Sequence, residues 1–251
     1  MTKKTRTILF AICVFLFSLT APSVIFYSQG YRFDFETRKI VQTGGLYFKV
    51  TPRSAQVYLN GKLIETTSIF TSSSLVENLL PKTYYVEIKK DGFNSWQKNM
   101  EVKERQVTEA KNITLIPQNI NFVKSIETPL PKYLANATSS DGNKVVKYDD
   151  HEIWISFPEE EKDIFLIRFS EKICQVFWLN DYYLIFNVGG KINLDFSPCS
   201  KLKVAEIDDR DRLNVIDIAE FKTPEIFWDN ANGKLYVSSE NTLYVSEGLL
   251  P

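Results

Sequence analysis

The chain has 251 residues, a length typical of one or two domains. Hydrophobic residues make up 44% and charged residues 24%, which excludes a disordered chain and a multi-pass membrane protein. The formal net charge of -1 gives no indication of nucleic-acid binding, and the single histidine, His151, excludes mechanisms that need two imidazoles. The surplus of 18 Phe and 12 Tyr favours strands over helices, so a mostly β protein is expected.

An uncharged apolar segment follows a short basic N-terminus. Residues 8–27 carry no charge, and their 20 residues form a helix of about 30 Å, the thickness of a bilayer core. Lys3, Lys4 and Arg6 precede the segment, and Asp34 is the first acidic residue. Basic residues before an apolar run hold the N-terminus in the cytoplasm, which predicts a single-pass cell-membrane anchor with the bulk of the chain extracytoplasmic.

Two other interpretations of this segment are open. A cleaved signal peptide needs a shorter apolar core, and Thr20-Ala21-Pro22 is a poor cleavage site because Pro22 would directly follow the cut. A helix of a soluble domain would carry a polar face, and this segment has none. We therefore predict a cytoplasmic stub and uncleaved anchor over residues 1–28, followed by a juxtamembrane segment over residues 29–43.

The next stretch, residues 44–117, has a hydrophobic period of two, which is typical of half-buried strands. Asn60-Gly61 and Asp91-Gly92 are hairpin turn signals, because the residues of both dipeptides accept the positive φ that tight hairpin turns need. About seven short strands in about 70 residues predict a β-sandwich. The positions expected to face its core are Leu46, Phe48, Val50, Val57, Leu59, Tyr84, Val86, Ile88, Met100, Val102, Ile113 and Leu115.

Two runs in this stretch carry a family resemblance. The first is GGLYF at residues 44–48 followed by TPRSAQVYLNG at 51–61; the second is NLLPKTYYVEI at 78–88, followed by Asp91-Gly92-Phe93 and Trp96. In this order they resemble a PEGA domain over residues 44–117. The name-giving tetrapeptide is Pro52-Arg53-Ser54-Ala55 here, and Lys82 stands where the family usually has Gly. The resemblance implies a bacterial extracytoplasmic β-sandwich that serves as an envelope spacer or binding module, without catalytic residues.

The C-terminal part contains a repeat. Residues 118–131 include Pro129 and Pro131 and few alternating positions, which predicts a linker. Three stretches that begin at Ser139, Trp178 and Trp228 then each combine a polar turn with a strand. A second strand is expected in each at residues 152–157, 191–196 and 241–246. Spacings of 40 to 50 residues are typical of propeller blades. Residues 131–251 therefore resemble WD-like or translocation-type β-propeller repeats, and an incomplete propeller-like domain is expected over residues 132–251.

The number of repeats leaves three arrangements open. Two full units and a fragment cannot close a ring, since propellers need about four blades or more. The first sheet could pair with the sandwich, two chains could complete each other as a homo-oligomer, or the units could stack as an open β-meander. An open array exposes edge strands, and Lys201 and Lys203 beside Val204 are expected to protect such an edge.

Four groups of residues are candidates for a site, and each has a structural alternative. Residues 149–152 (DDHE) are consecutive, so strand alternation separates them, and a turn is favoured over a metal site. Residues 208–212 (DDRDR) lack the Gly and distant Glu of a calcium loop, which favours a hairpin tip. Residues 159–163 (EEEKD) are typical of a solvated loop. Sugar stacking or core packing could explain the tryptophans, and core packing is favoured for Trp96, Trp154, Trp178 and Trp228.

The three cysteines indicate little. Cys13 lies in the expected anchor as an apolar filler. Cys174 and Cys199 lie 25 residues apart, and two separate buried thiols are favoured over a bridge, although an oxidising compartment permits one.

Motifs for catalysis are missing from the sequence, which has no Gly-x-Ser-x-Gly elbow, Gly-rich phosphate loop, paired-Cys zinc spacing or helical His pair. We therefore expect a non-catalytic, membrane-anchored extracytoplasmic scaffold or binding module that contacts cell-surface polymer or an envelope protein. No catalytic, metal or cofactor-binding residue is expected, and no nucleic-acid partner. The alternative is a propeller-type hydrolase or glycan-processing enzyme of the cell envelope, in which two carboxylates would converge in a cleft. A sensor is disfavoured, since seven residues before the apolar segment leave no room for an output domain.

Overall fold

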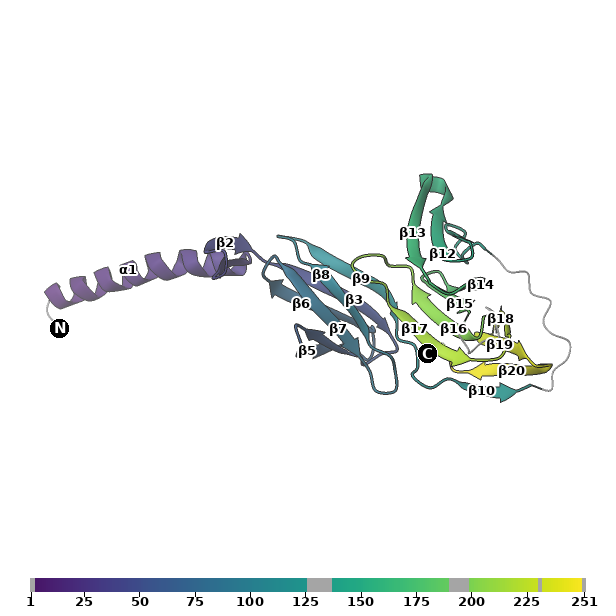
Figure 1. Cartoon of the computed structure of the whole chain (residues 1–251). Coiled ribbons are helices and arrows are strands. Elements are labelled where there is room, and N and C mark those ends of the chain that lie inside the picture. Colours follow the sequence, from purple (N-terminus) through teal and green to yellow (C-terminus); the bar gives the residue numbers. More distant parts are fainter. Residues whose placement is uncertain (1–2, 126–136, 190–198, 230–231, 250–251) are drawn as a thin grey trace.

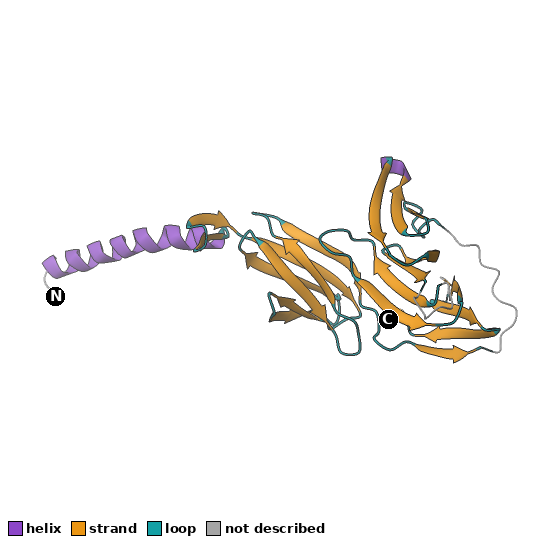
Figure 2. Ribbon diagram, viewed as in Figure 1, coloured by secondary structure: helices purple, strands orange, loops and turns teal. Residues whose placement is uncertain are grey.

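The computed structural model describes residues 3–125, 137–189, 199–229 and 232–249, and it is mostly β with one long helix. The helix, a hairpin, a sandwich and a group of C-terminal sheets follow one another along the molecule (Figure 1). Nearly all regular structure beyond the helix is strand (Figure 2). In chain order the elements are α1 (Lys3–Ser28), β1 (Tyr31–Asp34), β2 (Lys39–Gln42), β3 (Gly44–Thr51), β4 (Gln56–Leu59), β5 (Lys62–Thr66), β6 (Ser73–Leu79), β7 (Thr83–Lys89), β8 (Trp96–Glu101), β9 (Val107–Thr114), β10 (Asn121–Lys124), β11 (Val145–Tyr148), β12 (Glu152–Phe157), β13 (Lys162–Arg168), β14 (Ile173–Asn180), β15 (Tyr183–Val188), β16 (Lys201–Glu206), β17 (Val215–Glu220), β18 (Glu225–Asp229), β19 (Lys234–Ser239) and β20 (Thr242–Glu247).

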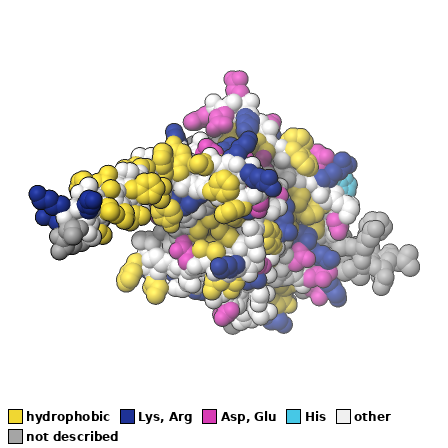
Figure 3. Space-filling model, turned by 90° about the vertical axis from the view of Figure 1, so that its left-hand side faces the viewer, with side chains coloured by type: hydrophobic (Ala, Val, Ile, Leu, Met, Phe, Trp, Pro, Cys, Tyr) yellow, Lys and Arg dark blue, Asp and Glu magenta, His cyan; other side chains and the backbone are white. Residues whose placement is uncertain are grey.

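The apolar segment forms α1, a helix of 26 residues with no buried residue. Its Phe and Leu side chains project outward all round, and hydrophobic groups cover its visible surface with basic groups at one end (Figure 3). By length and composition α1 is suited to cross a membrane. A helix that is apolar all round needs an apolar environment, and the described protein does not cover this one.

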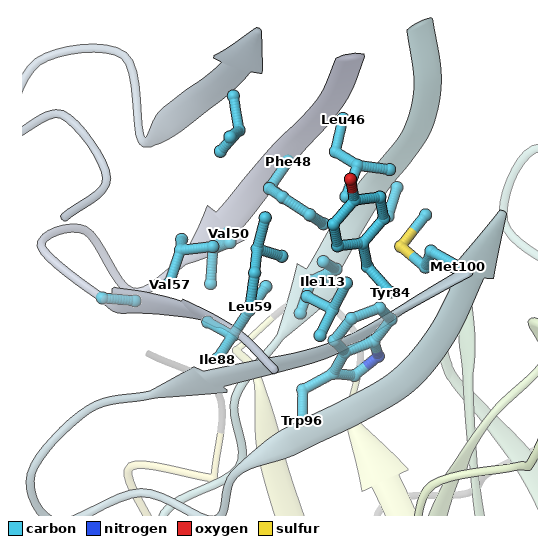
Figure 4. Packing of buried hydrophobic residues seen from close by; sticks show 14 of the residues in the cluster. Leu46, Phe48, Val50, Val57, Leu59, Tyr84, Ile88, Trp96, Met100 and Ile113 are labelled. Atoms are coloured by element: carbon cyan, nitrogen blue, oxygen red, sulfur yellow. The ribbon is translucent and has the colours of Figure 1, made fainter. Parts of the chain in front are cut away.

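Residues 44–116 fold into a β-sandwich of two sheets. One sheet has the order β6-β3-β9 and the other β5-β4-β7-β8. Their facing side chains form one core, with Phe48, Leu59 and Ile88 from different strands pointing toward one another (Figure 4). All twelve positions that the period of two assigned to the core are buried, which confirms the alternation. Asn60 and Gly61 have φ of 49° and 79°, as the predicted hairpin turn requires.

Three further sheets make up the C-terminal part of the described chain. Their orders are β11-β12-β13, β14-β15-β16-β17 and β10-β20-β19-β18. The β14–β17 sheet packs on both neighbours, because one core combines its side chains with those of β18 and β19 and a second core combines them with those of β12 and β13. Trp178 and Trp228, the two Trp-led starts of the repeat, lie buried in these cores. The three stretches that begin at Ser139, Trp178 and Trp228 thus fall in three different sheets, and the middle sheet packs on the other two.

Two expectations about this part are wrong. Residues 121–124, inside the stretch expected to be a linker, form β10, which pairs antiparallel with β20 at the opposite end of the C-terminal part. Lys201 and Lys203 belong to β16, which lies between β15 and β17 and is no edge. Lys203 instead forms an ion pair across the strands with Asp217. The second strand expected at residues 191–196 lies outside the described residues.

Cys174 and Cys199 form a disulfide, with their Cα atoms 6.1 Å apart, a separation within the usual range for a bridge. The expectation of two separate thiols is therefore wrong. Sequence spacing could not show that the two positions meet, because Cys199 approaches β14 only through the folding of the intervening chain. Cys13 is free and exposed on α1, as its place in the anchor predicts.

Candidate functional site: the junction between the sandwich and the C-terminal sheets

The acidic stretch at residues 149–152 forms the predicted turn, between β11 and β12. The Asp149 carboxylate accepts hydrogen bonds from the backbone N–H groups of His151 and Glu152, each at 2.7 Å. These hydrogen bonds lower the pKa of Asp149. Among the described residues no group of three or more His, Cys, Asp or Glu side chains is placed to hold a metal ion.

The other candidates separate into exposed and buried groups. Residues 158–160 form a single helical turn, and the acidic stretch around it is exposed, as predicted for a solvated loop. Trp96, Trp178 and Trp228 are buried, which confirms core packing for these three. Trp154 is partly exposed and contacts the ring of Phe165 edge-on, with centroids 5.1 Å apart.

Residues 208–212 form the predicted hairpin tip, between β16 and β17, and this tip docks on the sandwich. The Asp211 carboxylate accepts the backbone N–H of Asn99 at 2.8 Å. Arg210 donates from its guanidinium to the carbonyl oxygen of Glu109 at 2.9 Å. The tip is therefore a contact between the two parts of the protein. Its mixture of acidic and basic residues did not indicate this contact.

A buried ion pair lies at the centre of this contact. The Nζ of Lys98 on β8 lies 2.6 Å from Oε1 of Glu206 on β16, and their side chains are 0% and 5% exposed. Lys98 also donates to the backbone oxygen of Asp208 at 2.6 Å, while Trp96 donates from Nε1 to Oε2 of Glu206 at 2.7 Å. Both ions thus have several partners, which a buried pair needs to offset its loss of hydration.

Asn214 completes the hydrogen bonding of this pair. It donates to Oε1 of Glu206 from its backbone N–H at 3.1 Å and from Nδ2 at 2.7 Å. Its Nδ2 also donates to the backbone oxygen of Gln97 on β8 at 3.1 Å. The carboxylate therefore accepts hydrogen bonds from both parts of the protein, and Asn214 holds β8 against the β16–β17 hairpin.

The sequence does contain a signal for this pair. On β8, Lys98 falls on the inward positions of the alternating pattern, between Trp96 and Met100, both of which are buried. On β16, Glu206 follows Leu202 and Val204 with the same period. A lysine and a glutamate, each at an apolar position of its own strand, indicate that they face each other in a buried place. This signal lies in two single positions 108 residues apart, so the charged clusters of the sequence do not reveal it.

A cavity of about 250 Å³ lies beside the pair, lined by groups from both parts of the protein. Burial raises the pKa of the Tyr183 hydroxyl, which accepts the backbone N–H of Thr114 at 3.0 Å. Burial alone would also raise the pKa of Asp208, but hydrogen bonds from Arg210 and the charge of Lys98 hold that pKa below its ordinary value. The cavity wall thus contains a carboxylate, Asp208, whose ionised form is favoured by neighbouring cations.

The two carboxylates of the cavity lining, Glu206 and Asp208, bear on the enzyme alternative. Glu206 and Asp208 both lie within 4 Å of the Lys98 Nζ, at 2.6 and 3.9 Å, so the two acids are near each other, as a glycosidase would require. A glycosidase, however, needs one carboxyl with a raised pKa to protonate the leaving group. The pKa of Asp208 is lowered, and Glu206 is occupied by Lys98, Trp96 and Asn214. Through these contacts Glu206 joins the two parts of the protein.

A search against models of known protein families gives no match to this chain, and no curated protein matches it either.

Proposed function

We propose that this protein is a non-catalytic scaffold, anchored in a bacterial cell membrane by α1, that holds its β domains outside the cytoplasm for contact with cell-surface polymer or an envelope protein. The observation that carries the proposal is that α1 is apolar throughout and has no buried residue. Because no described part of the protein covers these side chains, lipid is the environment that can do so at lowest free energy.

Two features support an extracytoplasmic position of the β domains. Lys3, Lys4 and Arg6 precede the apolar segment, and the positive-inside rule assigns that end to the cytoplasm. The disulfide between Cys174 and Cys199 lies beyond the helix, and structural disulfides persist in oxidising compartments. Both features are consistent with a single-pass protein whose bulk faces the cell envelope.

The junction supports the role of a spacer. A scaffold that presents a surface at a fixed distance needs domains that do not move independently, and the buried pair of Lys98 and Glu206 joins the sandwich firmly to the C-terminal sheets. The resemblance of residues 44–117 to a PEGA domain agrees with an envelope spacer. In this proposal the three C-terminal sheets are propeller-like units, and the turns that contain Asp141 and Asp181 in the first two lie together, joined by a hydrogen bond of 3.0 Å.

The contact surface that we propose is the face of the β11–β13 sheet that carries Trp154 and Phe165. Phe165 is 44% exposed and Trp154 is partly exposed. Two ion pairs lie beside this aromatic pair. Lys147 on β11 pairs with Asp163 on β13, and Arg168 on β13 pairs with Glu152 on β12. Aromatic faces bordered by charged groups are suited to stack on sugar rings or on apolar side chains of a partner.

The experiment is a pull-down with full-length protein in detergent, using insoluble cell-wall material and, separately, soluble envelope proteins. We expect retention by one of the two, and loss of that retention in the double variant Trp154→Ala/Phe165→Ala. The matched control is Phe70→Ala, since Phe70 is 87% exposed in the loop between β5 and β6 of the sandwich. Absence of retention by either material, or equal retention of the double variant and wild type, would contradict the proposed contact surface.

A further inference from the structure

The β1–β2 hairpin is packed against the last turn of α1. The ring of Tyr31 meets the ring of Phe26 edge-on, with centroids 5.5 Å apart. The guanidinium of Arg32 lies 3.5 Å from the centre of the Tyr27 ring and donates to the Tyr27 carbonyl oxygen at 2.8 Å. The hairpin therefore lies beside the end of the helix (Figure 1). A surface that contacts this side of the helix end therefore lies beside the hairpin as well.

One face of this hairpin is apolar and exposed. Phe33 pairs directly with Ile40 across the two strands, and the Phe33 ring contacts that of Phe35 at 5.1 Å. Phe33, Phe35 and Ile40 are 49%, 84% and 71% exposed. Tyr31 has the same strand parity as Phe33 and packs on Phe26, so the apolar face of the hairpin is continuous with the apolar surface of α1.

The polar residues Arg32 and Glu36 of the hairpin contact the sandwich instead. Arg32 donates to Oδ1 of Asn78 on β6 at 3.0 Å, and Glu36 forms an ion pair with Lys82 of the sandwich at 3.1 Å. Asp34, only 8% exposed, accepts from the Thr37 hydroxyl at 2.7 Å and closes the turn. The hairpin is thus tied to the sandwich by its polar groups, while its apolar face has no described protein against it.

We infer that the exposed face of Phe33, Phe35 and Ile40 docks into the headgroup layer of the same bilayer that α1 spans. The inference rests on the proposed anchoring of α1. The segment 8–27 matches a bilayer core of about 30 Å, so its C-terminal end, at Phe26 and Tyr27, lies at the outer interface. Because the hairpin packs on these two residues, it lies at that depth too.

Lipid is a suitable occupant of this face on chemical grounds. Interfacial segments of membrane proteins bury apolar side chains such as Phe at the boundary between headgroups and acyl chains. Arg38, exposed in the turn, is available for lipid phosphates, since basic side chains near a membrane surface are attracted to them. Such docking would fix the tilt of the sandwich, because Asn78 and Lys82 connect it to the hairpin.

The test uses full-length protein in nanodiscs of phosphatidylcholine and phosphatidylglycerol, with Cys13→Ser so that one added cysteine carries an environment-sensitive fluorophore. The probe site is Phe35→Cys, where the native side chain is 84% exposed, and the control is Phe70→Cys, where it is 87% exposed. Phe70 lies just before β6, near Ser73, which pairs with Lys49 toward the end of β3. The hairpin adjoins the opposite end of this strand pair, where Gly44 at the start of β3 pairs with Leu79. The control therefore lies at the far end of a strand that spans about 25 Å.

We expect the label at residue 35 to emit at shorter wavelength than the label at residue 70 and to be protected from quenching by iodide. A label at residue 35 as water-accessible as that at residue 70, in protein that co-purifies with the nanodisc, would overturn the docking while leaving the anchor intact. Protein that fails to enter nanodiscs would overturn the anchor and the docking together. Both substitutions replace exposed side chains, so neither should disturb folding.

Discussion

Replacing Lys98 with alanine is expected to lower the free energy of unfolding by about 3–5 kcal/mol, because removal of one partner leaves the other buried and uncompensated. The Glu206 side chain is 5% exposed and would keep only the donors from Trp96 and Asn214. The measurement is denaturant unfolding of the full-length protein in detergent, followed by tryptophan fluorescence. Trp96 itself bonds to Glu206, so its emission reports on the junction.

Two further variants isolate the cause of this loss. Lys111→Ala removes a lysine from an ion pair with Glu109 whose side chains are about half exposed, and its unfolding transition should match that of wild type. Lys98→Met/Glu206→Gln removes both charges but retains an acceptor for Trp96, and it should recover much of the lost stability. A Lys98→Ala variant as stable as Lys111→Ala would contradict the role of the pair in joining the domains.

Replacing Phe48 with alanine is expected to lower the free energy of unfolding by about 3–5 kcal/mol, through lost burial and the cavity that remains. Phe48 is 0% exposed at the centre of the sandwich core, between Leu46 and Val50 on the same strand (Figure 4). The measurement is again denaturant unfolding of the full chain, with Phe70→Ala as the matched control on an 87% exposed phenylalanine. Equal effects of the two substitutions would show that the sandwich core is not where the structure places it.

The fold could be predicted wherever local pattern decides it. Alternation identified the core positions of the sandwich, because a strand sends successive side chains to opposite faces. Asn60-Gly61 identified a hairpin because few other pairs accept positive φ at both positions. The order of strands in the sheets could not be read in this way. β10 joins β20 across more than 100 residues, and no local feature of residues 121–124 distinguishes that strand from a linker.

The junction was missed for a related reason. The charged run at residues 208–212 would have the same composition whether the hairpin tip were solvent-exposed or docked on another domain. Composition alone therefore favoured a free hairpin tip. The more specific signal lay in single positions: Lys98 and Glu206 each occupy an apolar place in an alternating strand. Two such charges of opposite sign, 108 residues apart, form a pair only once the domains are placed. Long-range pairing of this kind depends on tertiary structure rather than on local propensity.

The most direct test of the account is extraction of membranes, from cells that express the full chain, with alkaline carbonate. An uncleaved α1 in lipid predicts that the protein stays in the membrane pellet at its full mass of 29.0 kDa. A product released into the supernatant, or one shortened by removal of the N-terminal helix, would contradict permanent anchoring and the envelope scaffold with it.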